Sequence, residues 1–206
     1  HQEQRAVVEI ISDDDSSWET SSAWSVQRPK SASPDDAGMI PHFIWTWFAT
    51  AGCALICSLF FKPGDTVFIE DPAYFLAVEM FRDSRLNLVS IATDQDGMRM
   101  DSLETEIQLS AAAREAAGSS SGGGGALPES RFGGQYDGLV FVVPTFGNPT
   151  GATMPDDRRR RLVSLARRHN LLVLSDDVYQ LLHFPGSQPT KRLVAYDLEA
   201  GAGRID

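Results

Sequence analysis

The chain has 206 residues, of which 42% are hydrophobic and 22% are charged, so its length and composition can support one packed domain. Its formal net charge of −10 argues against a nucleic-acid-binding protein, because phosphate contacts need clustered lysine and arginine. The one basic cluster, formed by Arg158 to Arg161 with Arg167 and Arg168, falls within a helical pattern, where we expect a solvated helix face.

Residues 1–42 are rich in Asp, Ser and Pro and poor in regularly spaced apolar residues. We expect this segment to be disordered or unrelated to the rest of the chain. The sequence begins at His1 and shows no signal peptide, so we expect a cytoplasmic location. Cys53 and Cys57 are four residues apart in an apolar stretch, which favours two core thiols of a reducing compartment over a disulfide or a metal site.

Residues 43–61 form a stretch of nineteen residues without a charge. Its length and composition allow a membrane span. The alternative is a buried helix that runs into the turn at Pro63 and Gly64. We favour the buried helix, because no Lys or Arg cluster flanks the stretch and an alternating strand and helix pattern follows at once.

Strands and helices alternate beyond this turn, with short links between them. The expected strands cover residues 66–69, 86–91, 139–143 and 171–174. The expected helices cover residues 73–82, a segment capped by Asp101, and a segment that opens at Pro155 and Asp156. Residues 117–135 are rich in Ser and Gly and should form a flexible insert. This order predicts an α/β fold with a mostly parallel sheet and helices on both faces.

Two polar motifs follow the last two expected strands. Asn148-Pro149-Thr150-Gly151 follows residues 139–143, and Asp176-Asp177-Val178-Tyr179 follows residues 171–174. Ligands of such sheets bind at the carboxyl ends of the strands, which is where both motifs lie. An aspartate there can pair with a protonated ring nitrogen, although the Asp176–Asp177 pair could equally bind a metal or cap a helix. The Asn148 amide can donate and accept hydrogen bonds, and an Asx-turn is its structural alternative.

The order of these motifs resembles the class I/II aminotransferases of fold type I, and residues 144–184 are similar to that family throughout. Upstream, residues 63–81 and 89–104 resemble the segments that precede the motifs in the family. The similarity covers residues 51–184 and is strongest to the 2-aminoadipate, kynurenine and aromatic aminotransferase branch. It implies that residues 43–206 form part of the large domain of a pyridoxal phosphate (PLP) transferase, a three-layer α/β/α structure.

The resemblance implies a role in cofactor binding for four residues. Tyr74 would stack on the pyridine ring, and Asp176 would keep the ring nitrogen charged. Asn148 and Tyr179 would hydrogen-bond the phenolic oxygen of the cofactor. For Asp177 we expect a structural role within the loop. The substrates implied are an amino acid and a 2-oxo acid, and the full-length members of the family are expected to be homodimers.

The sequence departs from the family pattern in three respects. The lysine that holds the cofactor as a Schiff base is expected thirty or more residues beyond the aspartate, and the chain ends at Asp206. Of the lysines present, Lys191 lies too close to Tyr179 for this role, so we expect no catalytic residue in the chain. The small C-terminal domain is missing, and the turn that cradles the phosphate is reduced to a segment around Gly52. We therefore expect a portion of a transaminase.

Other hypotheses remain open at this point. A PLP-dependent C–S lyase or synthase uses the same scaffold, and its distinguishing residues would lie outside these segments. A truncated remnant without catalytic activity would expose apolar faces and a sheet edge, and would be prone to aggregation. The last alternative is a protein tethered to a membrane by residues 43–61.

Overall fold

The computed structural model describes residues 7–10, 51–118, 136–180, 182 and 190–201. Its six-stranded sheet has the order β1-β6-β5-β2-β3-β4, and all neighbouring strands are parallel except β3 and β4. The strands are β1 (Val7–Ile10), β2 (Thr66–Asp71), β3 (Asn87–Asp94), β4 (Gly97–Met98), β5 (Gly138–Val142) and β6 (Leu171–Asp176). The helices are a helix over residues 51–60, α2 (Phe75–Asp83), α3 (Met100–Gly118), α4 (Asp156–Arg168) and α5 (Leu193–Gly201).

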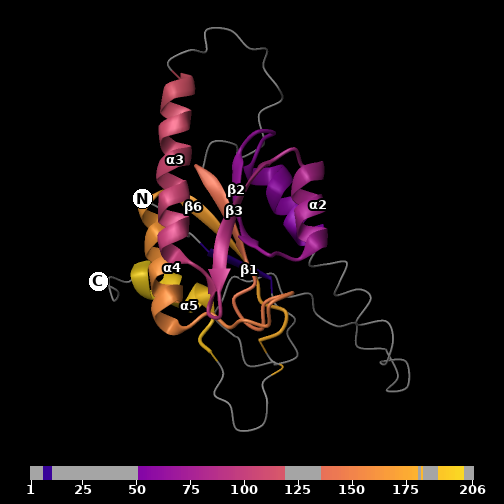
Figure 1. Cartoon of the computed structure of the whole chain (residues 1–206), viewed down its shortest axis with the longest axis vertical. Coiled ribbons are helices and arrows are strands. Elements are labelled where there is room, and N and C mark those ends of the chain that lie inside the picture. Colours follow the sequence, from indigo (N-terminus) through magenta and orange to yellow (C-terminus); the bar gives the residue numbers. More distant parts are fainter. Residues whose placement is uncertain (1–6, 11–50, 119–135, 181, 183–189, 202–206) are drawn as a thin grey trace, which may run out of the picture.

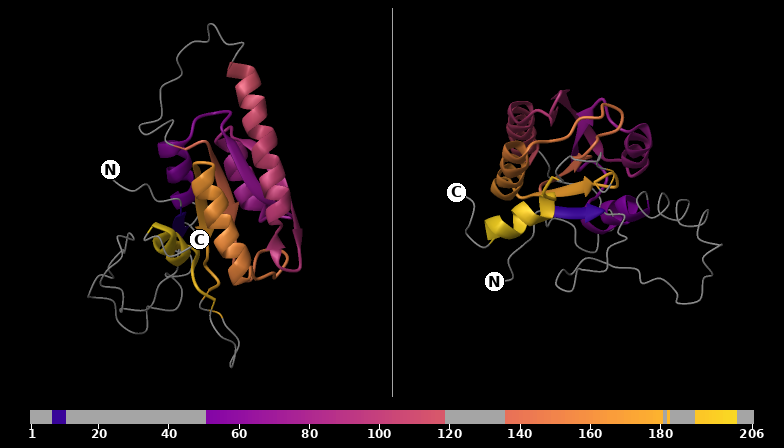
Figure 2. Two further views of the ribbon diagram at one scale, coloured as in Figure 1. Left: turned by 90° about the vertical axis from the view of Figure 1, so that its left-hand side faces the viewer. Right: turned by 90° about the horizontal axis from the view of Figure 1, so that it is seen from below.

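The sheet separates two apolar clusters, because successive strand side chains point to opposite faces. On one face, Phe68, Val140 and Val173 pack with residues of α3, α4 and α5. On the other face, Val67 and Phe141 pack with residues of α2 and of the helix over residues 51–60. Figure 1 shows α3 and α4 on one side of the sheet and α2 on the other, and the view from below in Figure 2 separates the same layers. The predicted three-layer α/β/α architecture is thus confirmed.

Most of the predicted elements form where the hydrophobic pattern placed them. Strand β5 is buried along its whole length, as expected of a continuous apolar run between two helix layers. Helix α3 begins at Met100, so Asp101 lies in its first turn and is not its cap. Helix α3 also extends to Gly118, into the range expected to be a flexible insert; residues 119–135 of that range lie outside the described residues.

Three described elements were not expected from the sequence. Val7–Ile10 form strand β1, which pairs with β6. The rest of the segment expected to be disordered, residues 1–6 and 11–42, lies outside the described part of the chain. The short strand β4 makes a hairpin with β3, and α5 follows residue 190. A strand of two to four residues and a short helix are too brief to show a clear periodicity.

The uncharged stretch at residues 43–61 is helical from residue 51, and residues 43–50 lie outside the described residues. Cys53 and Cys57 are buried free thiols, which confirms that they are core residues. No helix in the described ranges combines the length and the apolar character needed to cross a membrane.

The basic cluster on α4 is not the uniformly solvated face that its charge predicted. Arg159 is fully buried, at 0% exposure, and the Arg158 side chain is only 19% exposed. Arg160, Arg161 and Arg168 do face solvent. Arg167 is partly covered, with a side chain that is 26% exposed and donates to the buried Asp197. The expectation is wrong for Arg158 and Arg159 because each finds several acceptors beneath the helix, so their burial leaves the guanidinium hydrogen-bonded.

Candidate cofactor site

The carboxyl ends of β2, β5 and β6 meet at one edge of the sheet, since the three strands are parallel neighbours. Tyr74 lies three residues beyond the end of β2, at the cap of α2. Asp176 is the last residue of β6. Asn148 lies on the loop between β5 and α4. The structure therefore places these three of the four predicted residues at the edge where an α/β sheet binds ligands.

Asp176 is the most unusual group at this edge. Its Oδ1 atom is buried and has no hydrogen-bond partner among the described residues. Burial first, and then the charge on the neighbouring Asp177, raise the pKa of this carboxyl from 3.8 to about 6. A buried carboxylate oxygen without a partner is costly, so the site calls for a donor that the described residues do not supply.

Tyr74 and Tyr179 lie near Asp176 on the face of the sheet that α2 covers. Both phenol rings are partly buried against the same apolar cluster. The pKa of the Tyr74 hydroxyl is raised by burial first, and then by electrostatic interactions with Tyr179 and Asp176. The Cys53 thiol belongs to this group too, since burial and the charge on Asp176 both raise its pKa.

Asn148 is held on a loop that folds back on itself between residues 143 and 155. The Gly147 N–H donates to the Ala152 carbonyl oxygen at 2.8 Å, and the Met154 N–H donates to the Pro144 carbonyl oxygen at 2.9 Å. A Cβ at Gly147 would lie 3.0 Å from the Val143 carbonyl oxygen, so any larger residue there would press against this part of the backbone. In the described part of the chain, Asn148 makes no hydrogen bond to Tyr74, Asp176 or Tyr179.

Arg159 fixes the base of this loop, a role that the sequence pattern did not indicate. Its guanidinium donates to the carbonyl oxygens of Met154 and Pro144, both at 2.7 Å, and to Thr145 Oγ1 at 3.0 Å. It also donates to the Lys191 carbonyl oxygen at 3.1 Å. Arg159 stands in a run of four arginines, so its charge alone could not distinguish it from its solvated neighbours.

The Asp176–Asp177 pair had two further interpretations. Residues 178–180 form a turn instead of a helix, so neither aspartate caps a helix, and the capping interpretation is wrong. Among the residues that the structure describes, no three His, Cys, Asp or Glu side chains converge as metal ligands. Asp177 is buried, at 2% exposure, within the loop where a structural role was expected.

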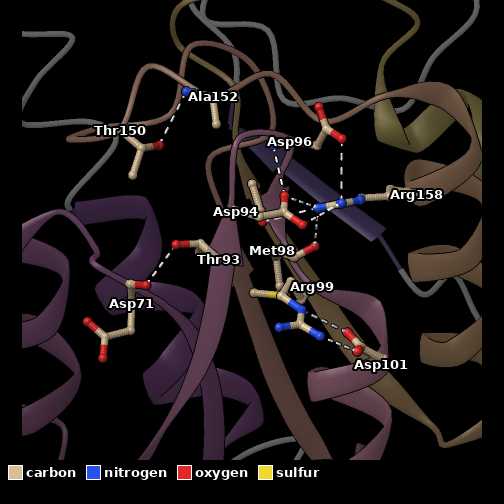
Figure 3. A network of polar contacts seen from close by, with 11 residues as sticks. Asp71, Thr93, Asp94, Asp96, Met98, Arg99, Asp101, Thr150, Ala152 and Arg158 are labelled. Carbon is tan, nitrogen blue, oxygen red and sulfur yellow. Dashed lines mark hydrogen bonds and ion pairs between the residues drawn. The ribbon is translucent and has the colours of Figure 1, made fainter.

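A separate polar cavity of about 300 Å³ lies beside the end of β3. Arg158 lines this cavity and donates to both carboxylate oxygens of Asp94, each at 2.7 Å. Arg99, which also lines it, pairs with Asp101 (Figure 3). The hydrogen bonds from Arg158, and then the backbone hydrogen bond from Asp96, lower the pKa of Asp94 to about 2. The arginines that line the cavity form ion pairs with carboxylates. Tyr74, Asp176 and Tyr179 do not line it.

Comparison with known proteins gives one consistent family. The sequence profile of "Aminotransferase class I and II" matches residues 48–202. Aromatic-amino-acid aminotransferase 1 of Thermococcus litoralis is 32% identical over 151 residues, which cover 73% of this chain and 30% of that protein.

Two solved structures share the fold. Kynurenine aminotransferase of Pyrococcus horikoshii, in complex with PMP, has a TM-score of 0.58 at 30% identity and covers 73% of this chain and 32% of that one. A multiple substrate aminotransferase from Thermococcus profundus has a TM-score of 0.52 at 28% identity and covers 71% of this chain and 31% of that one. The chain thus spans about a third of the length of these relatives.

Proposed function

Because the chain belongs to the aminotransferase class I and II family, an enzyme family that uses pyridoxal phosphate, we propose that Asp176 and its neighbours bind this cofactor for transamination. The reaction would move an amino group between an amino acid and a 2-oxo acid. The observation that carries the proposal is the buried Asp176 Oδ1 atom, which has no donor among the described residues.

The residues at the sheet edge fit the chemistry of pyridoxal phosphate. A protonated pyridine nitrogen is a charged donor, and it would satisfy the orphaned carboxylate oxygen of Asp176. The pairing would also lower the pKa of Asp176 from its raised value of about 6, because an opposite charge favours the ionised form. The partly buried ring of Tyr74 offers a flat surface on which an aromatic cofactor would stack.

Each of the four residues would act on a different part of the cofactor. Asp176 would keep the ring nitrogen protonated, and Tyr74 would orient the ring by stacking. Asn148 and Tyr179 would donate hydrogen bonds to the phenolic oxygen. Pyridoxal phosphate, when bound, supplies a ring that withdraws electrons and so stabilises negative charge developing on the substrate. The ion pair at Asp176 would be strong in this role because the carboxylate is largely shielded from water.

Binding of pyridoxamine 5′-phosphate (PMP) to the full chain tests the proposal. This form has an amine in place of the aldehyde, so its binding needs no covalent bond to a lysine. In a titration followed by cofactor fluorescence, we expect saturable binding to the native chain. The variant Asp176→Asn should bind at least about tenfold more weakly, a loss of about 1.4 kcal/mol. Glu79→Gln, which alters an exposed side chain of α2, is the matched control.

Two outcomes would count against the proposed function. One is that the native chain shows no saturable binding of PMP although its circular dichroism and thermal melt show a folded protein. The other is that Asp176→Asn binds as tightly as the native chain, because the ring nitrogen would then be held elsewhere.

A further inference from the structure

Glu70 carries a partly buried carboxylate at the point where strands β2 and β5 separate. Backbone pairing between the two strands ends at Ile69 and Phe141. Strand β2 continues to pair with β3 for two further residues. The Val143 N–H lies beyond the last β2–β5 pair, and it donates to Glu70 Oε2 at 3.2 Å. A side-chain oxygen therefore takes the place that a strand carbonyl would otherwise fill.

The same carboxylate also contacts the hairpin between β3 and β4. A Cβ built on Gly97 would lie 3.5 Å from Glu70 Oε1. Burial raises the pKa of Glu70 from 4.5 to about 7, and the nearby backbone N–H groups of Val143 and Met98 act in the opposite direction. Arg158 also holds this hairpin, by donating to the Gly97 and Met98 carbonyl oxygens, in the network of Figure 3.

Glu70 points away from Tyr74 and Tyr179, which are proposed to contact the cofactor. Side chains alternate along β2, so Glu70 shares a face with Phe68, which packs toward α3 and α4. Tyr74 and Tyr179 pack on the opposite face. Glu70 therefore cannot act on the ring directly, and its effect on the site must pass through the backbone segments that it joins.

Those segments lead to two residues of the proposed site, Tyr74 and Asn148. Strand β2 leads in four residues from Glu70 to Tyr74, and Val143 leads in five residues to Asn148. Resting on the proposed function, we propose that Glu70 is a positioning residue: its carboxylate joins the ends of β2 and β5 and the β3–β4 hairpin, and so sets Tyr74 and Asn148 at the spacing that the cofactor requires.

Amide hydrogen exchange on the full chain without cofactor tests the positioning itself. Glu70→Gln keeps one acceptor oxygen at the same reach, so exchange at Val143 should stay within about twofold of the native rate. Glu70→Asp keeps the charge but withdraws both oxygens by one methylene, and exchange at Val143 and in the β3–β4 hairpin should rise by about tenfold or more. Glu79→Asp provides the matched exposed control on α2.

PMP affinity tests the consequence for the site. Glu70→Asp should weaken binding by about fivefold or more, whereas Glu70→Gln should stay within about twofold of the native chain. This contrast separates positioning from charge, because the variant that keeps the acceptor is rescued although it loses the carboxylate. Equal exchange in the native chain and Glu70→Asp would overturn the inference, as would a Gln variant that exchanges as fast as the Asp variant.

The two proposals fail in different ways. If the native chain does not bind PMP, the proposed function is wrong, and the exchange rates still decide whether Glu70 joins the three segments. If the native chain binds PMP and Glu70→Asp exchanges faster but binds equally well, Glu70 is structural and the positioning role is wrong.

Discussion

Ionising Asp176 in the absence of a ligand has a free-energy cost, because its Oδ1 atom is buried without a donor among the described residues. Its pKa is raised from 3.8 to about 6. The folded state therefore binds the proton more tightly than the unfolded state does. The stability that this proton contributes is fully present below pH 3.8 and is lost as the pH rises through about 6. Glu70 contributes with the same sign, and its loss extends to about pH 7.

We predict that Asp176→Asn removes part of this pH dependence. The native chain should be less stable toward urea at pH 8 than at pH 5, and the variant should narrow that difference by about 1 to 2 kcal/mol. Urea denaturation at the two pH values, followed by circular dichroism, measures the effect. Glu79→Gln should leave the difference unchanged, since its side chain is 60% exposed. A variant with the full native pH dependence would show that Asp176 ionises without cost.

The loop between β5 and α4 depends on two glycines for different physical reasons. A Cβ at Gly147 would approach the Val143 carbonyl oxygen to 3.0 Å, a contact with backbone that cannot move aside easily. Gly151 has open space around its Cβ position, but its φ of +72° disfavours any other residue. The first glycine therefore serves close packing, and the second serves backbone conformation.

We expect Gly147→Ala to disturb the loop more than Gly151→Ala does. The strained φ should cost Gly151→Ala about 1 kcal/mol, and the clash should cost Gly147→Ala about 2 to 3 kcal/mol. Chemical denaturation measures both. Gly64→Ala, at a turn on another part of the chain with φ +93°, is matched to Gly151→Ala in strain and should cost a similar amount. Equal losses for Gly147→Ala and Gly64→Ala would mean that the Val143 carbonyl moves aside.

The sequence predicts elements with a strong period and misses contacts that cross between elements. Strands β5 and β6 are continuous apolar runs, and α4 has a regular apolar stripe, so all three were predicted near their observed bounds. Asp176 and Tyr74 were recognised from motifs. Glu70 was not singled out, since its partner Val143 is distant in sequence and donates through the backbone, which carries no sequence signal.

At the scale of the whole molecule, the helix layer formed by α2 and the helix over residues 51–60 is incompletely buried. Phe75 is 67% exposed and Leu76 is 41% exposed on α2, and Leu55 is 57% exposed on the helix over residues 51–60. Large apolar side chains gathered on one layer favour association with other molecules. The opposite layer also exposes Leu109, at 58%, on the long helix α3.

We predict that the double variant Leu55→Ser with Phe75→Ser lowers self-association of the chain. Sedimentation velocity over a range of concentrations should show a smaller share of oligomer or aggregate than in the native chain. Stability should change by no more than about 0.5 kcal/mol per site, since exposed side chains contribute little to packing. Leu109→Ser is the control on the other layer. The prediction fails if Leu109→Ser reduces association as much as the double variant does.

Strand β1 has a consequence for the order in which the chain can fold. Val7 pairs with Val173, so the sheet joins residues that lie near opposite ends of the sequence. During synthesis on the ribosome, β1 emerges before any other described strand, and its partner β6 emerges after all the rest. Contacts of such long sequence separation form slowly. Strand β1 must therefore remain unpaired with its final neighbour until β6 has been translated.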